Sequence, residues 1–144
     1  MNALSLCLTS AGCFFLVGLL SGSWKYARIR RSAEARAPVY VDVVHRASLM
    51  YAFANVLLAR FVERSRWMDR TNLVAASVLE LFFATSVAGY ALHGLLRDTD
   101  NQFRRPHRLG SLIVPDAALT AYMVALTGTE IVAFVILFSG FLLA

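Results

Sequence analysis

Residues 3–24 read ALSLCLTSAGCFFLVGLLSGSW and contain no charged side chain. A helix that crosses the hydrocarbon core of a bilayer needs about 20 predominantly apolar residues, and this run is long enough. A basic cluster from Lys25 to Arg31 follows it directly, which is typical of the end of a transmembrane segment. No Lys or Arg precedes the run, so we interpret it as a retained helix and not as a signal peptide.

The composition of the whole chain agrees with a membrane location. Of the 144 residues, 58% are hydrophobic and 16% are charged, whereas a soluble domain has about 45–50% and about 25%. The length predicts one domain, residues 1–144. The net charge of +5 comes from basic residues in short loops between apolar runs. We therefore interpret the charge as a topology signal and expect no nucleic-acid partner.

Three further apolar runs, 43–62, 73–96 and 116–143, follow the first one. Together the four runs predict an all-α membrane protein, a bundle of four transmembrane helices. The loop between the second and third runs is short, so these helices should be antiparallel neighbours. Gly18 and Gly22 form a pair of small residues that lets helices approach closely. This pair predicts either a homo-oligomer or close packing within one bundle.

The basic residues predict an orientation. The first and third loops carry ten of the 14 Lys and Arg residues, and the second loop carries the other four. Because basic loops stay on the cytoplasmic side, the first and third loops should be cytoplasmic and both termini should face outward.

Four ionisable groups lie within the apolar runs or at their edges, namely His45, Glu80, His93 and Glu130. Such groups are costly at membrane depth, so each is a candidate site. His45 is either a metal ligand or an ordinary interface residue. Glu80 and Glu130 form either a proton or ion site or separate hydrogen-bonded structural acids. The roles of His93 and of His107, in the polar loop, stay open.

Two tyrosines and an asparagine are polar companions of His45. Tyr51 and Asn55 are one helical turn apart and share a face. His45 and Tyr51 are six positions apart and therefore do not. Tyr90 lies about a turn and a half before the end of the third run. In an antiparallel pair of helices this position matches the depth of His45.

Two short stretches carry a family resemblance. The first is VHRASLMYA at residues 44–52, and the second runs from VAGY at 87–90 to PHRLG at 106–110. Their order and spacing resemble the styrene oxide isomerase family, which consists of small haem-dependent membrane enzymes with four helices. The resemblance covers about residues 43–140. It implies a homotrimer in a bacterial cytoplasmic membrane, with haem between the subunits.

The resemblance also implies roles for individual residues. His45 would be the axial ligand of a b-type haem, and we suggest Arg46 as a partner of the haem propionates. Tyr90 would be the catalytic tyrosine. The family has an asparagine at the position of Tyr51, and Asn55 is a possible substitute. The implied reaction opens a small hydrophobic epoxide to a carbonyl product, by Lewis-acid polarisation of the C–O bond and a 1,2-shift.

Three other functions stay open. A glutathione-using four-helix membrane transferase would need an Arg, Asn and Glu signature on the second helix, and Arg46 is followed one turn on by Leu49 and Met50 instead. A non-catalytic haem or quinone electron carrier would also use His45. An accessory subunit of a membrane complex would need no site. Phosphate-loop, zinc-hydrolase and serine-hydrolase motifs are absent from the sequence.

Overall fold

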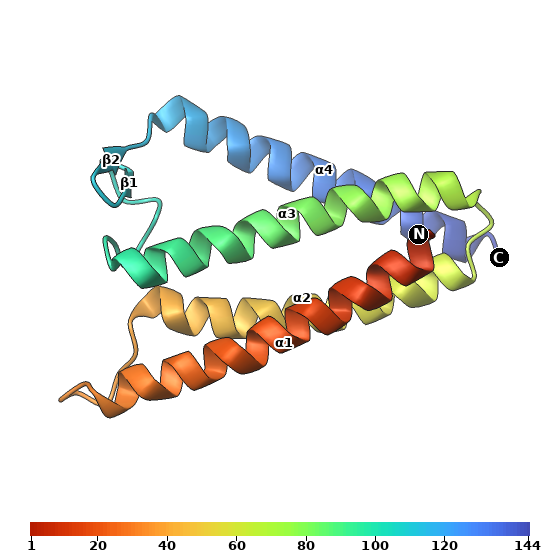
Figure 1. The fold of residues 1–144 in the computed structure, drawn as a ribbon. Helices are drawn as coiled ribbons and strands as arrows, with labels where there is room; N and C mark the ends of the chain where they lie inside the picture. The colour runs from red at the N-terminus through yellow and green to blue at the C-terminus, as the bar shows by residue number, and fades with distance from the viewer.

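The computed structural model describes all residues from Met1 to Ala144 and contains four long helices. They are α1 (Ala3–Arg30), α2 (Val39–Glu63), α3 (Asp69–Leu96) and α4 (Asp116–Leu142) (Figure 1). The predicted all-helical architecture of four helices is confirmed. A two-stranded antiparallel hairpin, β1 (Arg108–Leu109) and β2 (Leu112–Ile113), lies in the loop before α4. The polar composition of this loop did not predict the hairpin.

α1, α2 and α3 extend beyond the apolar runs by one or two turns, whereas α4 matches its run to within one residue. α1 continues through the basic cluster to Arg30, so that Arg28 and Arg30 lie in its last turn. Cations there interact favourably with the negative end of the helix dipole. α2 and α3 begin before their apolar runs, with Asp42 and Asp69 in the first turns. Hydropathy does not detect the first turn of α3 because its side chains are polar, and Asp42 interrupts the apolar residues at the start of α2.

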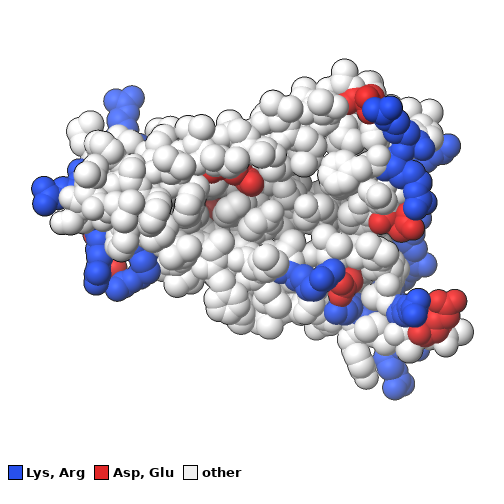
Figure 2. Space-filling view, turned by 180° about the vertical axis from the view of Figure 1, so that it is seen from behind, with Lys and Arg blue, Asp and Glu red and all other residues white.

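Three of the helices, α1, α3 and α4, are long and apolar enough to cross a membrane. In Figure 2 the basic and acidic side chains gather at the two ends of the molecule, and the surface between them is mostly uncharged. This distribution fits a protein that spans a bilayer. The crossing of the membrane by α2 stays a prediction, because charged residues flank its apolar middle.

The helices alternate in direction along the chain. Both termini and the α2–α3 connection lie at one end of the bundle, and the α1–α2 connection and the hairpin lie at the other (Figure 1). The first and third loops are thus at the same end, as their shared basic character requires. The side of the membrane that each end faces stays a prediction.

Close packing of α1 against α2 depends on two glycines. A Cβ atom at Gly18 would lie 2.5 Å from Cδ2 of Leu49, and one at Gly22 would lie 2.9 Å from Cε1 of His45. Cβ atoms in real structures essentially never lie this close to a neighbour, so a side chain at either position would displace Leu49 or His45. Gly18 and Gly22 therefore serve packing within one chain, which is one of the two alternatives that their spacing left open.

α4 packs more loosely than the other helices. Its buried residues are Ala133, Leu137 and Gly140, all in its second half. The indole Nε1 of Trp67 donates a hydrogen bond to the Ile136 carbonyl at 3.0 Å and holds this half against the α2–α3 loop. The first half of α4 stands away from the bundle, which leaves a groove between α3 and α4.

Candidate functional site

His45 lies on the face of α2 that packs against α1. Its Nδ1 atom is 2.8 Å from the carbonyl oxygen of Gly18. A carbonyl only accepts hydrogen bonds, so Nδ1 carries the proton and Nε2 is left with a free lone pair. Nε2 has no hydrogen-bond partner in the structure. Gly22 makes room for the imidazole, since any side chain there would collide with it.

The donor chemistry at His45 fits a metal ligand. Histidines that bind metals almost always donate their second ring N–H to a carbonyl or carboxylate, which fixes the tautomer and the ring orientation. The Gly18 carbonyl holds His45 in this way. The residues present therefore fit the axial ligand that the isomerase resemblance implies.

The cations near His45 share one carboxylate. Asp42, one turn before Arg46, accepts from Lys25 Nζ and, at 2.8 Å, from Arg46 Nη2. The side chain of Arg46 is 66% exposed. An exposed ion pair of this kind contributes about 0–1 kcal/mol to stability. Arg46 would therefore lose little if its guanidinium left Asp42 and bound another carboxylate. Arg46 is therefore free to bind a propionate.

Tyr51 and Tyr90 are brought together by α2 and α3. They line a cavity of about 250 Å³ that α3, α4 and the polar loop enclose, with Thr85, Ser86 and Tyr122. They also line an adjacent cavity of about 230 Å³, together with Arg46. Two of the residues predicted to be catalytic thus share one cavity, and Arg46 shares the next.

Aromatic stacking orients both tyrosine rings. The ring of Tyr51 stacks on Phe83 with 4.2 Å between centroids, and Phe14 packs on it at 5.8 Å. The ring of Tyr90 stacks on Tyr40 at 6.1 Å. Because stacking leaves the hydroxyl edge of each ring free, the tyrosines combine a fixed position with an available polar group.

Sequence reasoning missed Tyr122 on α4. Its hydroxyl lies 2.9 Å from Thr85 Oγ1 on α3, across the same cavity. Nothing in the spacing of Tyr122 relates it to Tyr51 or Tyr90, because it reaches them only through the packing of α4 on α3. The sequence shows only that Tyr122 is a tyrosine on a membrane helix. This does not tell whether the side chain lines a cavity or lies at the membrane interface.

Asn55 is apart from this cavity. It is fully buried, and its Nδ2 donates to the Tyr51 carbonyl at 3.0 Å and to Glu80 Oε2 at 3.3 Å. Asn55 Oδ1 and Glu80 Oε1 are buried and have no hydrogen-bond partner. Asn55 therefore connects α2 to α3 within the bundle. Although it shares a helix face with Tyr51, the two side chains point to different surroundings.

His45 and Tyr90 do not share a cavity within one chain. The two cavities that Tyr51 and Tyr90 line do not include His45. His45 contacts α1, whereas Tyr90 lines a cavity with Arg46, the next residue of α2. The depth expected for Tyr90 thus agrees with the structure, but a single chain does not place its side chain next to His45.

Glu130 lies in an apolar cavity of about 290 Å³ between α2, α3 and α4, beside Leu79 and Phe83. Its Oε1 atom is buried and has no hydrogen-bond partner. Glu80 binds Asn55 instead, so the two acids form no pair. No group of three or more His, Cys, Asp or Glu side chains lies together as a metal cluster.

His93 and His107 attach the polar loop to the helix ends. His93 Nδ1 donates to Asp98 Oδ1 at 2.8 Å, and Asp98 also accepts from the backbone N–H of Gly110. His107 Nε2 donates to Asp116 at 2.8 Å. Burial opposes ionisation of Asp98, but the hydrogen bonds from Gly110 and His93 prevail and lower the pKa of Asp98 below its usual range.

Comparison with protein-family models, with curated proteins and with solved structures gives no match for this chain. The function must therefore be argued from the side chains and their arrangement. The resemblance of residues 43–140 to the isomerase family stays a prediction.

Proposed function

We propose that the chain is a haem-dependent membrane isomerase that opens a small apolar epoxide to a carbonyl product. The observation that carries the proposal is the hydrogen bond from His45 Nδ1 to the Gly18 carbonyl, 2.8 Å long, which leaves Nε2 free as a ligand. The isomerase resemblance around the same histidine supports the same conclusion.

The haem iron, when bound, would supply a Lewis acid that polarises the epoxide C–O bond. His45 would hold the cofactor through Nε2, and Arg46 would pair with a propionate carboxylate. The hydroxyls of Tyr51 and Tyr90 would donate hydrogen bonds to the substrate and orient it. The reaction needs no reductant, because one C–O bond breaks, a substituent shifts to the neighbouring carbon, and the oxygen becomes a carbonyl.

The walls around the tyrosines support this chemistry. The cavity of Tyr51 and Tyr90 is also lined by Phe103, Met123 and Leu126. Apolar walls exclude the water that would otherwise add to an electron-poor carbon and give a diol. The cavity volume of about 250 Å³ restricts the substrate to a small hydrophobic molecule.

The proposal requires more than one copy of the chain. His45 lines neither of the cavities that Tyr90 lines, so a complete site combines His45 of one copy with the tyrosine cavity of the next. A head-to-tail contact of this kind closes into a ring, such as the trimer that the resemblance implies. We further propose that α2 crosses a bacterial cytoplasmic membrane beside α1, with the first and third loops inside.

The first test is an absorption spectrum of the detergent-purified protein, expressed with ample haem. We expect a Soret band that His45→Ala removes and that the control His107→Gln retains. Wild-type protein should convert an aryl epoxide to a carbonyl compound without added reductant, and Tyr90→Phe should lower turnover at least about tenfold with the Soret band unchanged. A protein without a Soret band would overturn the proposal. A haem protein that undergoes redox cycling but leaves the epoxide unchanged would favour the electron carrier.

Co-expression of two inactive variants tests the shared site. His45→Ala keeps the tyrosine cavity, and Tyr90→Phe keeps the ligand. If each site uses both residues from neighbouring copies, random mixing makes about one site in four complete and restores about a quarter of wild-type turnover. If both residues act within one chain, no complete site forms and the mixture stays inactive.

A further inference from the structure

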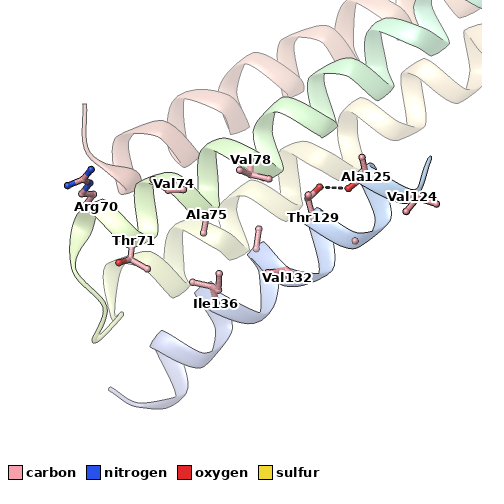
Figure 3. A pocket seen from close by; sticks show the side chains of 12 residues that line it. Arg70, Thr71, Val74, Ala75, Val78, Val124, Ala125, Thr129, Val132 and Ile136 are labelled. Carbon is pink, nitrogen blue, oxygen red and sulfur yellow. Dashed lines mark hydrogen bonds between the residues drawn. The ribbon is translucent and has the colours of Figure 1, made fainter. Parts of the chain in front are cut away.

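A groove with a volume of about 720 Å³ lies between α3 and α4. Its walls are mainly aliphatic, with Val74, Val78, Val124, Val132 and Ile136 among them (Figure 3). Thr129 on the wall already donates its hydroxyl to the Ala125 carbonyl, so it offers no free donor. The groove therefore accepts an elongated apolar group along most of its length.

The length of the groove matches one leaflet of a bilayer. On α3 it runs from Arg70 to Val78, which corresponds to about 12 Å at 1.5 Å per residue. On α4 it runs from Val124 to Ile136, about 18 Å. Half of the hydrocarbon core of a bilayer is about 15 Å thick. A lipid acyl chain that enters at one end would therefore fill the groove.

One end of the groove is polar and cationic. Arg70 and Thr71 lie together at this end, away from Val124 and Ala125 (Figure 3). The ion pairs of the structure do not include Arg70, so its guanidinium has no carboxylate partner. Trp67 lies at the same end of the groove, because its indole donates to the carbonyl of Ile136. Tryptophan is enriched at the interface between membrane and water, so this end of the groove is expected at that interface.

We propose that this groove binds a phospholipid, with its phosphate on Arg70 and Thr71 and one acyl chain between α3 and α4. A guanidinium binds two phosphate oxygens at once, so a lipid phosphate would neutralise the unpaired charge of Arg70. The acyl chain supplies contacts to α4 between Val124 and Ile136, where α3 leaves the groove open. The inference does not depend on the proposed enzymatic function.

Photolabelling tests the groove. The full chain is placed in phosphatidylcholine nanodiscs that contain a trace of phosphatidylglycerol with a diazirine in one acyl chain, and labelled peptides are mapped by mass spectrometry. We expect labelling of residues 70–78 and 124–136 at least about fivefold above that of the exposed α1 face at Leu16, Leu19 and Leu20. Arg70→Gln should lower groove labelling about tenfold, as for loss of a charge-assisted hydrogen bond. The control Arg30→Gln, at the other end of the bundle, should not.

A second variant separates lipid binding from misfolding. Val78→Trp fills the groove with an apolar side chain, keeps Arg70 and suits a membrane helix. It should abolish groove labelling and leave the α1 face labelled as before. Equal labelling of the groove and the α1 face, or unchanged labelling of Arg70→Gln, would overturn the proposal. So would cross-links between two copies through cysteines placed at Val74, since a second copy would then occupy the groove.

Discussion

Gly22→Ala is the most direct probe of how α1 positions His45. The new methyl carbon would lie 2.9 Å from His45 Cε1 and 3.1 Å from Nδ1, whereas an ordinary contact begins at 3.4 Å. The imidazole must therefore withdraw by about half an ångström. Such a shift would lengthen the hydrogen bond between His45 Nδ1 and the Gly18 carbonyl from 2.8 Å to about 3.3 Å and weaken it.

Two opposing terms set the magnitude of the effect on stability. Alanine is favoured over glycine in a helix interior by about 1 kcal/mol. The weakened hydrogen bond removes about 0.5–1.5 kcal/mol, and the steric displacement of the ring adds to that loss. Gly12→Ala is the matched control on the same helix, because nothing lies within 4 Å of a Cβ there. We expect Gly22→Ala to be less stable than Gly12→Ala by about 1–2 kcal/mol.

The assay is unfolding in mixed micelles of detergent and sodium dodecyl sulfate, followed by circular dichroism. A haem titration of both variants adds a second readout, because loss of a partner that orients a metal ligand lowers metal affinity about 10–100-fold. Equal unfolding free energies for Gly22→Ala and Gly12→Ala would refute the placement of the His45 ring against Gly22. Equal stability with a large difference in haem affinity would also contradict the reasoning, since both effects arise from one displacement.

Three further predictions concern contacts outside the cavity. Asn55→Ala and Glu80→Ala should each lower the unfolding free energy by about 1–3 kcal/mol, and the double variant should lose about 0.5–3 kcal/mol less than their sum, as measured in the same micelle assay. Because the pKa of Asp98 is lower when folded than when unfolded, its contribution is present above the unfolded value and is lost as the pH falls through the folded one. Hydrogen exchange at Gly110, corrected for intrinsic rate, should thus rise below about pH 4, and Asp98→Asn should remove this pH dependence. Trp67→Phe should weaken the attachment of α4 by about 1 kcal/mol, visible as faster exchange of its last turns, and an unchanged rate would exclude the Ile136 contact.

The sequence predicted the helices well because membrane helices depend on long apolar runs. Every run became a helix, and the differences lie in the polar turns at the ends, such as the extension of α1 to Arg30. The hairpin before α4 had no such signal. Its strands have two residues each, and Gly110 in the turn between them donates a backbone hydrogen bond to Asp98. A short strand pair of this kind depends on tertiary hydrogen bonds and not on a periodic pattern.

The sequence named candidate residues one by one and not their arrangement. Tyr51 and Tyr90 line a common cavity, whereas Asn55, one turn from Tyr51 on α2, binds Glu80. Helix periodicity gives the direction of a side chain relative to its own axis. It does not tell which neighbour occupies that direction, so the surroundings of Asn55 and the part of Tyr122 were not predictable.

The packing of these helices was hard to predict for a physical reason. Helices in lipid gain little free energy from burying apolar surface against one another, because lipid tails are equally apolar. Polar contacts and small residues therefore select which helices pack together. In this chain two of the contacts that do so end on backbone carbonyls, from His45 to Gly18 and from Trp67 to Ile136. A carbonyl has the same chemistry at every residue, so it leaves no trace in the sequence. The donor residues could be recognised in advance, but their acceptors, and with them the placement of His45 outside the cavities that Tyr90 lines, required the structure.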